Sequence, residues 1–350
     1  MSVGQTMQID PKLYKRLPEP LVKWFRTNAR ELPWRQNPTP YFIWLSEIML
    51  QQTRIETVRG YFERFRTALP DIPSLAAADE EQVLKLWEGL GYYSRARNLR
   101  AAAKEIMEKH QGRFPETFAE IRALPGIGDY TAGAVCSIAF GLPEPAVDGN
   151  VMRVIARLAA FEGDVRSAAI RKEVAEGLRK VYPRGAESDF TQALMELGEV
   201  VCTPAGSPDC SHCPLADFCL AQKSGRQSAL PIPPEKKRRP VEKRTVLLLL
   251  CGGKVALRKR PSRGLLANLW EFPSLDGWKS GRDIAALLGG IHVVKGPSAV
   301  HVFSHLAWDM ISFSAELPGE TGEFSWFEPD RFPAVPSAFR VFRDAMVQRK

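Results

Sequence analysis

Two carboxylic acids, Glu47 and Asp148, stand in segments that could give their side chains different pKa values. Glu47 lies in the stretch TPYFIWLSEIMLQQT, and on a helix it shares a face with Ile43, Trp44, Leu50 and Gln51. Apolar surroundings raise the pKa of a carboxylate and let it keep a proton near neutral pH, as a general acid must. The same periodicity fits a glutamate turned to the surface or paired with an arginine, and by itself it favours that simpler arrangement.

Asp148 lies near the end of a glycine-rich stretch, Leu124–Asn150, that reads LPGIGDYTAGAVCSIAFGLPEPAVDGN. Gly126 and Gly128 form a Gly-x-Gly turn before a helix of small residues, and such a turn exposes backbone N–H groups that suit a DNA phosphate. An ordinary helical hairpin with a helix-capping aspartate has the same pattern. The hairpin alone leaves these two interpretations open.

Four cysteines lie close together in the chain, at Cys202, Cys210, Cys213 and Cys219. The seven, two and five residues between them predict a metal site rather than disulfides, because we expect no export signal in the N-terminal stretch. Thiolates at this density bind zinc or an iron–sulfur cluster, and the spacing alone slightly favours zinc. His212 lies between adjacent cysteines, which indicates a solvated loop residue rather than a further ligand.

The elements that must position these residues follow from hydrophobic periodicity and from Pro, Gly and Asp punctuation. Amphipathic segments predict helices over 20–29, 40–52, 55–68, 79–87, 93–110, 116–122, 130–140, 149–160, 167–181 and 188–200. Pro231–Pro240 is rich in proline and charge and should be an extended linker. Beyond it, the pattern predicts strands over 246–250, 254–257, 291–294, 299–304 and 306–315 and a helix over 337–347.

The sequence therefore predicts a multidomain protein with an all-α body and a C-terminal α+β domain. We expect the all-α region over 1–225, a basic, proline-rich linker over 226–243 and the second domain over 244–350. The net charge of +8 and the isoelectric point near 9.2 weakly favour a polyanionic partner. The chain has no run of eighteen apolar residues, so we expect no membrane span.

Several motifs occur together, within roughly residues 32–219: LPWR, TPYFIWLSEIMLQQT, GLGYYSRARNL, LPGIGDYTAGAV, VDGNVMRV and the four cysteines. In this order they resemble the catalytic half of adenine DNA glycosylases of the MutY type, in the helix-hairpin-helix/Gly-Pro-Asp superfamily of base-excision glycosylases. The resemblance implies a helix-hairpin-helix subdomain over about 30–140. It also implies a cluster subdomain built from the N-terminal segment and 141–225.

The resemblance implies a role for each catalytic position. Glu47 stands where the family has the acid that protonates adenine N7 and handles the attacking water, and Asp148 stands where a second carboxylate stabilises the sugar cation. Asn150 matches a polar residue of the site, and Tyr130 matches a hairpin residue that lines the pocket. Related glycosylase-lyases carry a lysine at the hairpin position as a Schiff-base nucleophile. The tyrosine here therefore predicts a monofunctional glycosylase.

The same resemblance implies contacts with DNA. Gln52 and Tyr92 match residues that wedge into the duplex, although the motif does not decide between Tyr92 and Tyr93. Arg35 matches the arginine of the LPWR motif near the pocket, and a phosphate contact or a structural ion pair fits it nearly as well. The glycines of the hairpin, Gly126 and Gly128, would meet phosphate.

The family's cysteine pattern of six, two and five points to a [4Fe–4S] cluster, and this chain has one extra residue in the first gap. Residues 244–350 resemble the family's C-terminal domain, which has a fold like that of Nudix hydrolases. The glutamate-rich metal-binding helix of those hydrolases is missing after Pro273, which predicts a reading domain rather than a hydrolase.

Within that domain, Phe303, Ser304 and His305 match the family's loop that recognises 8-oxoguanine. Without the resemblance, a strand end with a core phenylalanine would be the simpler interpretation.

The implied activity is excision of adenine mispaired with 8-oxoguanine, or with guanine, in double-stranded DNA during base excision repair. A thymine or uracil mismatch glycosylase on the same scaffold is the first alternative. A non-catalytic lesion-binding protein and a Nudix-type nucleotide hydrolase are alternatives of other classes. We expect a monomer in the bacterial cytoplasm, associated with the nucleoid, because the N-terminal stretch lacks a targeting pattern.

Overall fold

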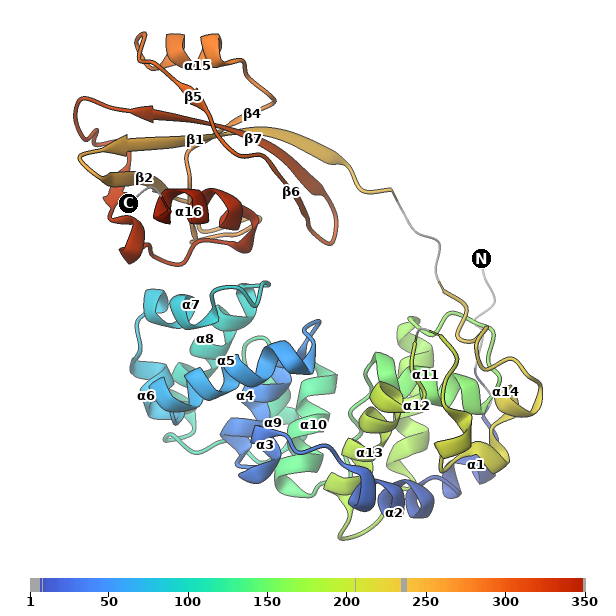
Figure 1. Cartoon of the computed structure of the whole chain (residues 1–350). Helices are drawn as coiled ribbons and strands as arrows, with labels where there is room; N and C mark the ends of the chain where they lie inside the picture. The colour runs from blue at the N-terminus through green and yellow to red at the C-terminus, as the bar shows by residue number, and fades with distance from the viewer. Residues whose placement is uncertain (1–6, 8, 205, 234–237, 349–350) are drawn as a thin grey trace. The chain divides into compact units, whose positions relative to one another are not determined.

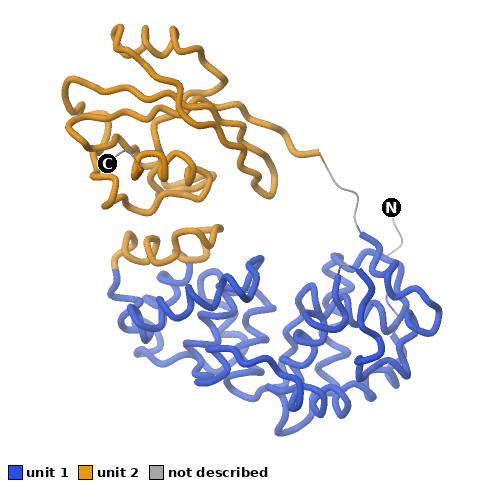
Figure 2. Tube along the Cα trace, viewed as in Figure 1, with its two compact units in different colours: residues 1–78, 98–235 blue, residues 79–97, 236–350 orange. Residues whose placement is uncertain are grey.

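The chain folds into two compact units, in a computed structural model that describes residues 7, 9–204, 206–233 and 238–348. Unit 1 comprises residues 1–78 and 98–235, and unit 2 comprises residues 79–97 and 236–350 (Figure 2). The boundary between 235 and 236 lies inside the predicted linker. The assignment of 79–97 to the second unit was not expected from the sequence.

The described residues of unit 1 form helices, so the predicted all-α body is confirmed. The helices are α1 (Pro11–Lys15), α2 (Pro18–Asn28), α3 (Pro33–Gln36), α4 (Pro40–Leu50), α5 (Ile55–Ala68), α6 (Ile72–Ala77), α9 (Phe118–Ala123), α10 (Asp129–Phe140), α11 (Gly149–Leu158), α12 (Ala168–Arg179), α13 (Glu187–Val200) and α14 (Leu220–Lys223). Two 3₁₀ turns, Cys210–His212 and Ala216–Phe218, lie among the cysteines. Helix α8 (Ser94–Lys109) begins in unit 2 and ends in unit 1.

Capping residues explain why the main helices begin where the sequence predicts. Thr39 accepts a hydrogen bond from the N–H of Phe42 at the start of α4, and Pro40 occupies the first turn. Asp148 caps α11 in the same way. The short helices α1, α3, α6 and α14 were not predicted, because four to six residues are too few to show a helical period.

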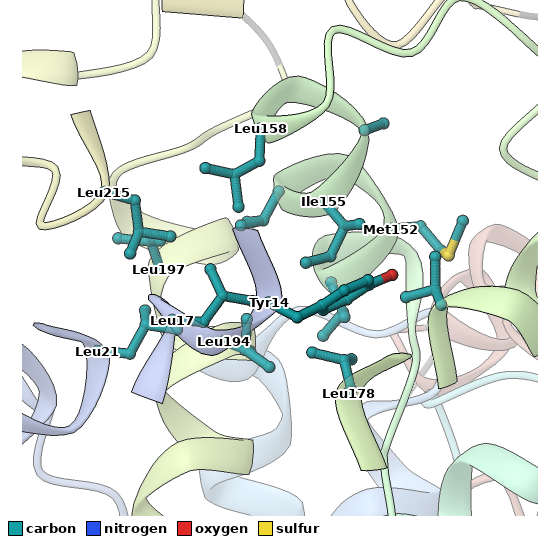
Figure 3. Close-up of a cluster of buried hydrophobic side chains, with 14 of the residues drawn as sticks. Tyr14, Leu17, Leu21, Met152, Ile155, Leu158, Leu178, Leu194, Leu197 and Leu215 are labelled. Atoms are coloured by element: carbon teal, nitrogen blue, oxygen red, sulfur yellow. The ribbon is translucent and has the colours of Figure 1, made fainter. Parts of the chain in front are cut away.

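The N-terminal segment shares a hydrophobic core with the second half of unit 1. Figure 3 shows Tyr14 and Leu17 packed among side chains of α11 and α13, including Ile155 and Leu194. Burial of such side chains contributes about 1.5–3 kcal/mol each. This core fixes α11, and therefore its N-terminal residue Asp148, against α13.

Unit 2 is an α+β layer structure, as predicted. Its strands are β1 (Val241–Cys251), β2 (Lys254–Lys259), β3 (Trp270–Glu271), β4 (Ser274–Asp276), β5 (Val294–Lys295), β6 (Ala299–Val302), β7 (Ala307–Glu316) and β8 (Ser325–Phe327). The sheet order is β3-β2-β1-β7-β5, β1 and β7 are parallel, and β4, β6 and β8 pair with β1, β7 and β2. Its helices are α7 (Glu80–Trp87), α15 (Gly281–Leu287) and α16 (Arg340–Val347).

Side chains that alternate along the strands pack into two hydrophobic cores, one on each face of the sheet. Val246 and Leu248 of β1 face the core that includes Phe342 of α16, and Leu247 of β1 faces the core that includes Ile284 of α15. The two helices accordingly lie on opposite faces of the sheet (Figure 1).

The structure departs from the predicted strand pattern at several places. Strand β1 begins at Val241, inside the predicted linker, because it pairs with β7 from that residue onward. The predicted strand 291–294 is reduced to β5, and α15, β3, β4 and β8 were not predicted. The C-terminal helix begins at Arg340 because Ser337–Phe339 form a 3₁₀ turn. Among the described helices, none has the length and apolarity needed to span a membrane.

Candidate active site

One cavity of about 660 Å³ in unit 1 brings together predicted residues from separate segments of the chain. Those that line it are Arg35, Glu47, Gln52, Gly126, Gly128, Tyr130, Asp148 and Asn150. They come from α3, from α4 and the turn after it, from the turn before α10 and the first turn of α10, and from the start of α11. The structure therefore gathers the proposed acids and the hairpin glycines at a single site.

Glu47 is buried in this cavity wall, with 5% of its surface exposed. The phenol O–H of Tyr130 donates a hydrogen bond to Glu47 Oε2 at 2.6 Å. Burial raises the pKa of Glu47 to about 7; the charge of Asp148 adds to this, and the Tyr130 hydrogen bond and Arg35 oppose it. Burial also raises the pKa of Tyr130, so the phenol remains a donor. Glu47 can therefore hold and release a proton near neutral pH.

Asp148 has a more polar environment than Glu47. Its carboxylate accepts hydrogen bonds from the backbone N–H of Val151 at 2.7 Å and from Asn150 Nδ2 at 2.8 Å. Burial raises the pKa of Asp148, while these two bonds and the charge of Arg153 hold it down. These donors stabilise the ionised carboxylate and oppose the effect of burial, but the pKa of Asp148 still lies above its usual value. Asp148 thus has more groups that stabilise its charge than Glu47 has.

Two glycines let the segment that carries Asp148 lie close to its neighbours. A Cβ atom at Gly133 of α10 would stand 2.2 Å from the carbonyl oxygen of Pro145. A Cβ atom at Gly198 of α13 would stand 2.6 Å from Asn150 Cβ. The small-residue helix noted in the sequence is therefore required for this close approach, and it sets the position of Asp148.

A buried arginine that the sequence analysis did not single out connects the cavity with the cysteine loop. Arg153 donates to Asn150 Oδ1 at 2.7 Å, to the carbonyl of Gly198 at 2.8 Å and to the carbonyl of Cys202 at 2.7 Å. Asn150 in turn donates to Asp148. The only local signal was a charge on the apolar α11, which is too common to assign a role.

Arg35 forms a structural ion pair at the edge of the cavity, one of the roles left open by the sequence. Its guanidinium donates to Glu196 Oε2 at 2.9 Å and to Gln192 Oε1 at 2.8 Å. Arg30 donates to the other oxygen of Glu196 at 2.6 Å. Burial would raise the pKa of Glu196, but the hydrogen bonds from both arginines bring it below its usual value. Glu196 also lines the cavity and was not predicted.

The four cysteines line one small pocket together with the buried Arg157. Arg157 donates to Cys202 Sγ at 3.1 Å and to the carbonyl of Thr203 at 2.9 Å. His212 turns away and pairs with Asp209, as expected of a loop residue. Four thiols beside one cation fit a thiolate-bound metal or cluster, although no group of His, Cys, Asp and Glu within the described ranges has the spacing that would hold a metal ion.

A second cavity, of about 360 Å³, lies in unit 2 and is lined by Tyr92, Phe303, Ser304 and His305. These last three form a tight turn between β6 and β7, closed by a hydrogen bond from the N–H of Phe303 to the carbonyl of Leu306 at 2.8 Å. Ser304 and His305 are exposed, while the Phe303 ring is half-buried against Trp308, with ring centroids 4.8 Å apart.

The structure also distinguishes the two tyrosines of the GLGYY motif. Tyr93 is buried and its hydroxyl accepts a hydrogen bond from the N–H of Gly89, whereas Tyr92 is 48% exposed. Tyr92 has a positive φ of 47°, and Gln52 of unit 1 has a φ of 59°. Strained, exposed side chains of this kind are typical of binding residues.

Comparisons with known proteins agree with both units. Residues 45–180 match the HhH-GPD superfamily of base excision DNA repair proteins, and residues 245–342 match the NUDIX domain. The adenine DNA glycosylase of Rattus norvegicus is 34% identical over 93% of this chain and 77% of the rat protein. A thermostable thymine-DNA glycosylase structure has a TM-score of 0.55 and 28% identity, and covers 61% of this chain and 98% of that one. A non-covalent endonuclease III–DNA complex has a TM-score of 0.53 and 26% identity, and covers 62% of this chain and 99% of that one.

Replacing Tyr130 with phenylalanine should raise the pKa of Glu47 above about 7. The phenol O–H stabilises the charged carboxylate, so its loss favours the protonated form. A carbon-13 NMR titration of labelled glutamate measures this pKa. Tyr61→Phe, a change of the same kind on α5, should leave it unchanged. An unchanged or lower pKa in the Tyr130→Phe protein would show that the hydrogen bond does not set the proton affinity of Glu47.

Proposed function

Because this chain belongs to the adenine DNA glycosylases, within the HhH-GPD superfamily, we propose that it removes adenine mispaired with 8-oxoguanine or guanine in duplex DNA. One observation carries the proposal: Glu47, buried and hydrogen-bonded to Tyr130, lines the same cavity as Asp148, whose carboxylate accepts hydrogen bonds from Val151 and Asn150. Cleavage of an N-glycosidic bond needs one acid to protonate the leaving base and one anion to stabilise the oxocarbenium-like sugar.

The mechanism follows from these two environments. The adenine must leave the stack to reach the cavity, because its reacting atoms are inaccessible in a duplex. Glu47, with a pKa near 7, donates its proton to adenine N7 as the glycosidic bond breaks. Asp148 stays ionised and stabilises the developing positive charge of the sugar. The Glu47 carboxylate then accepts a proton from the attacking water, and an abasic site remains.

The absence of a lysine supports a monofunctional enzyme. No described residue that lines the 660 Å³ cavity is a lysine, and Tyr130 occupies the hairpin position nearest to Glu47. A β-lyase of this superfamily requires an amine that forms a Schiff base with the sugar. We therefore infer that the product is an intact strand with an abasic site.

The choice of adenine over thymine rests on the second unit. The thymine-DNA glycosylase structure covers 61% of this chain, whereas the rat adenine DNA glycosylase matches 93% of it. The pocket with Phe303, Ser304 and His305 has an aromatic ring and two exposed hydrogen-bonding side chains. Such a set can stack on a base and contact an edge that carries the N7–H and O8 of 8-oxoguanine.

The Nudix-like unit is proposed to read the lesion, not to hydrolyse nucleotides. The segment after Pro273, where the resemblance places the metal-binding glutamates of a Nudix hydrolase, contains α15, and the single carboxylate of this helix, Asp283, forms a capping box with Ser280. A pyrophosphate hydrolase needs several carboxylates to hold Mg²⁺.

Cys202, Cys210, Cys213 and Cys219 are proposed to hold a [4Fe–4S] cluster, with zinc as the alternative. Bound there, the cluster would hold the loop 202–219 in a fixed shape. The Arg157 side chain would then donate to a ligand sulfur, and Arg153 would tie the loop to Asn150.

Single-turnover base release tests the proposed substrate. Duplexes that contain A opposite 8-oxoguanine, A opposite G, A opposite T and T opposite G are compared. Adenine should be released fastest opposite 8-oxoguanine, and Glu47→Gln should lower the rate about 100-fold or more because it removes the proton donor. Glu56→Gln, at an exposed position of α5, is the matched control. Thymine release from the T:G duplex, or full activity of Glu47→Gln, would refute the assignment.

The rate of adenine release should decrease with rising pH above about 7. The pKa of Glu47 is raised to about 7, so its protonated form predominates below that pH and is lost above it. The rate should therefore fall about tenfold per pH unit on the alkaline side. Single-turnover rates between pH 5.5 and 9, chosen as about two units on each side of the pKa, measure this limb. A rate that increases through this range would exclude Glu47 as the acid.

Metal analysis tests the cysteine site. Protein purified without oxygen should contain about four iron atoms and four acid-labile sulfides per chain. Cys213→Ser should lose most of the iron, whereas Cys251→Ser, which changes a cysteine of unit 2, should keep it. One zinc atom and no iron in the wild-type protein would establish the zinc alternative.

A further inference from the structure

The unit 2 pocket has a second wall that β-sheet pairing does not support. The loop 261–269 connects β2 with β3 and contributes Gly264, Leu265 and Leu266 to the pocket. Leu266 has a positive φ of 57°, which a bulky L-residue rarely adopts unless surrounding contacts hold it, and Asn268 has a φ of 60°, which asparagine tolerates. The opposite wall is the turn that carries Phe303, Ser304 and His305. Something must keep these two walls at a fixed separation.

Arg260 contacts the first wall directly and lies near Trp308, which packs behind the second. Its backbone N–H closes the loop through the carbonyl of Leu269, and its Nε donates to the carbonyl of Leu265, both at 2.9 Å. Its guanidinium carbon also lies 5.7 Å from the ring centroid of Trp308, the residue against which Phe303 packs edge-on. One side chain thus supports the loop directly and the turn through Trp308.

A buried acid holds the Arg260 side chain in this place. Glu271, on β3, is 2% exposed, and Arg260 donates to its Oε2. Arg258 donates to the other oxygen, Oε1, at 3.0 Å. The side chain of Arg260 is 16% exposed and that of Arg258 is 46% exposed. The two arginines share a partner, but only Arg260 has contacts to Leu265 and Trp308.

We propose that Arg260 is a positioning residue that sets the width of the reading pocket and thereby the discrimination between 8-oxoguanine and guanine opposite adenine. The inference rests on the proposed function. The two bases differ by an oxygen at C8 and a hydrogen at N7, so telling them apart requires side chains placed to within a fraction of an ångström. Arg260 need not contact the base itself. It holds in place the two walls of the pocket that contact the base.

The test compares Arg260→Met with Arg258→Met in the full-length holoprotein. Each change removes one positive charge from the Glu271 pair, and methionine keeps much of the aliphatic stem. Single-turnover adenine release and duplex affinity are measured for A opposite 8-oxoguanine and A opposite guanine. Arg260→Met should lose about tenfold or more of the preference for 8-oxoguanine, with the A:G rate within about twofold of wild type. Arg258→Met should keep the wild-type preference.

Arg260→Lys provides a second variant in case methionine disturbs folding. Lysine retains the charge next to Glu271 but cannot donate to Leu265 and Glu271 with the planar geometry of a guanidinium, so the preference should still fall. Thermal denaturation of all variants reports their stability separately from their discrimination.

Three results would overturn the inference. Equal preferences in Arg260→Met and Arg258→Met, or a preserved preference in Arg260→Lys, would show that the Leu265 and Trp308 contacts do not matter. An equal loss of rate on both duplexes would reveal a general structural role. If wild type itself shows no preference for 8-oxoguanine, the proposed partner base is wrong and this inference fails with it. That outcome is distinct from the first, which leaves the partner base established.

Discussion

The constraint on which the site depends is the burial of one carboxyl group, that of Glu47, in an apolar helix. Removing a carboxylate from water costs several kcal/mol unless hydrogen bonds replace the lost hydration or the group takes up a proton. Glu47 receives one such bond, from Tyr130, and burial still raises its pKa to about 7. The pKa of Glu47 is therefore set by two opposing effects. Further hydrogen-bond donors would lower the pKa and keep the group ionised, whereas loss of the Tyr130 bond would raise the pKa and keep the group protonated.

The rest of unit 1 gives Asp148 more hydrogen-bond donors than Glu47 has, although burial raises the pKa of both acids. Asp148 takes two donors at the start of α11, and this helix is fixed by the core that the N-terminal segment completes. The segment that carries Asp148 can lie close to α10 and α13 because Gly133 and Gly198 have no side chain.

Local sequence patterns predicted the main helices well, but they did not predict the long-range contacts of individual side chains. Helix α5 matches the predicted 55–68 because its apolar period is unbroken. The apolar neighbours of Glu47 raised the possibility of a buried acid, but the pattern alone favoured a surface position, and only the family resemblance singled this residue out. Arg153 and Glu196 were missed because their partners lie 49 and 161 residues away in the chain, where no periodicity can indicate them. The choice between Tyr92 and Tyr93 likewise needed three-dimensional packing. Part of the loop 261–269 supported the resemblance of the C-terminal domain, but its conformation gave no local signal, because its hydrogen bond with Arg260 appears only in the structure.

In unit 2, the turn proposed to read the lesion is built on a rigid base. Phe303 is half-buried against Trp308, and its turn is closed by a backbone hydrogen bond, so the exposed Ser304 and His305 project from an ordered segment. Exposed side chains on a mobile loop would lose conformational entropy when they bind a base. Anchoring the turn in the core transfers that cost to folding, where it is offset by burial of Trp308 and its neighbours. The specificity of such a turn therefore depends on residues that never touch the base.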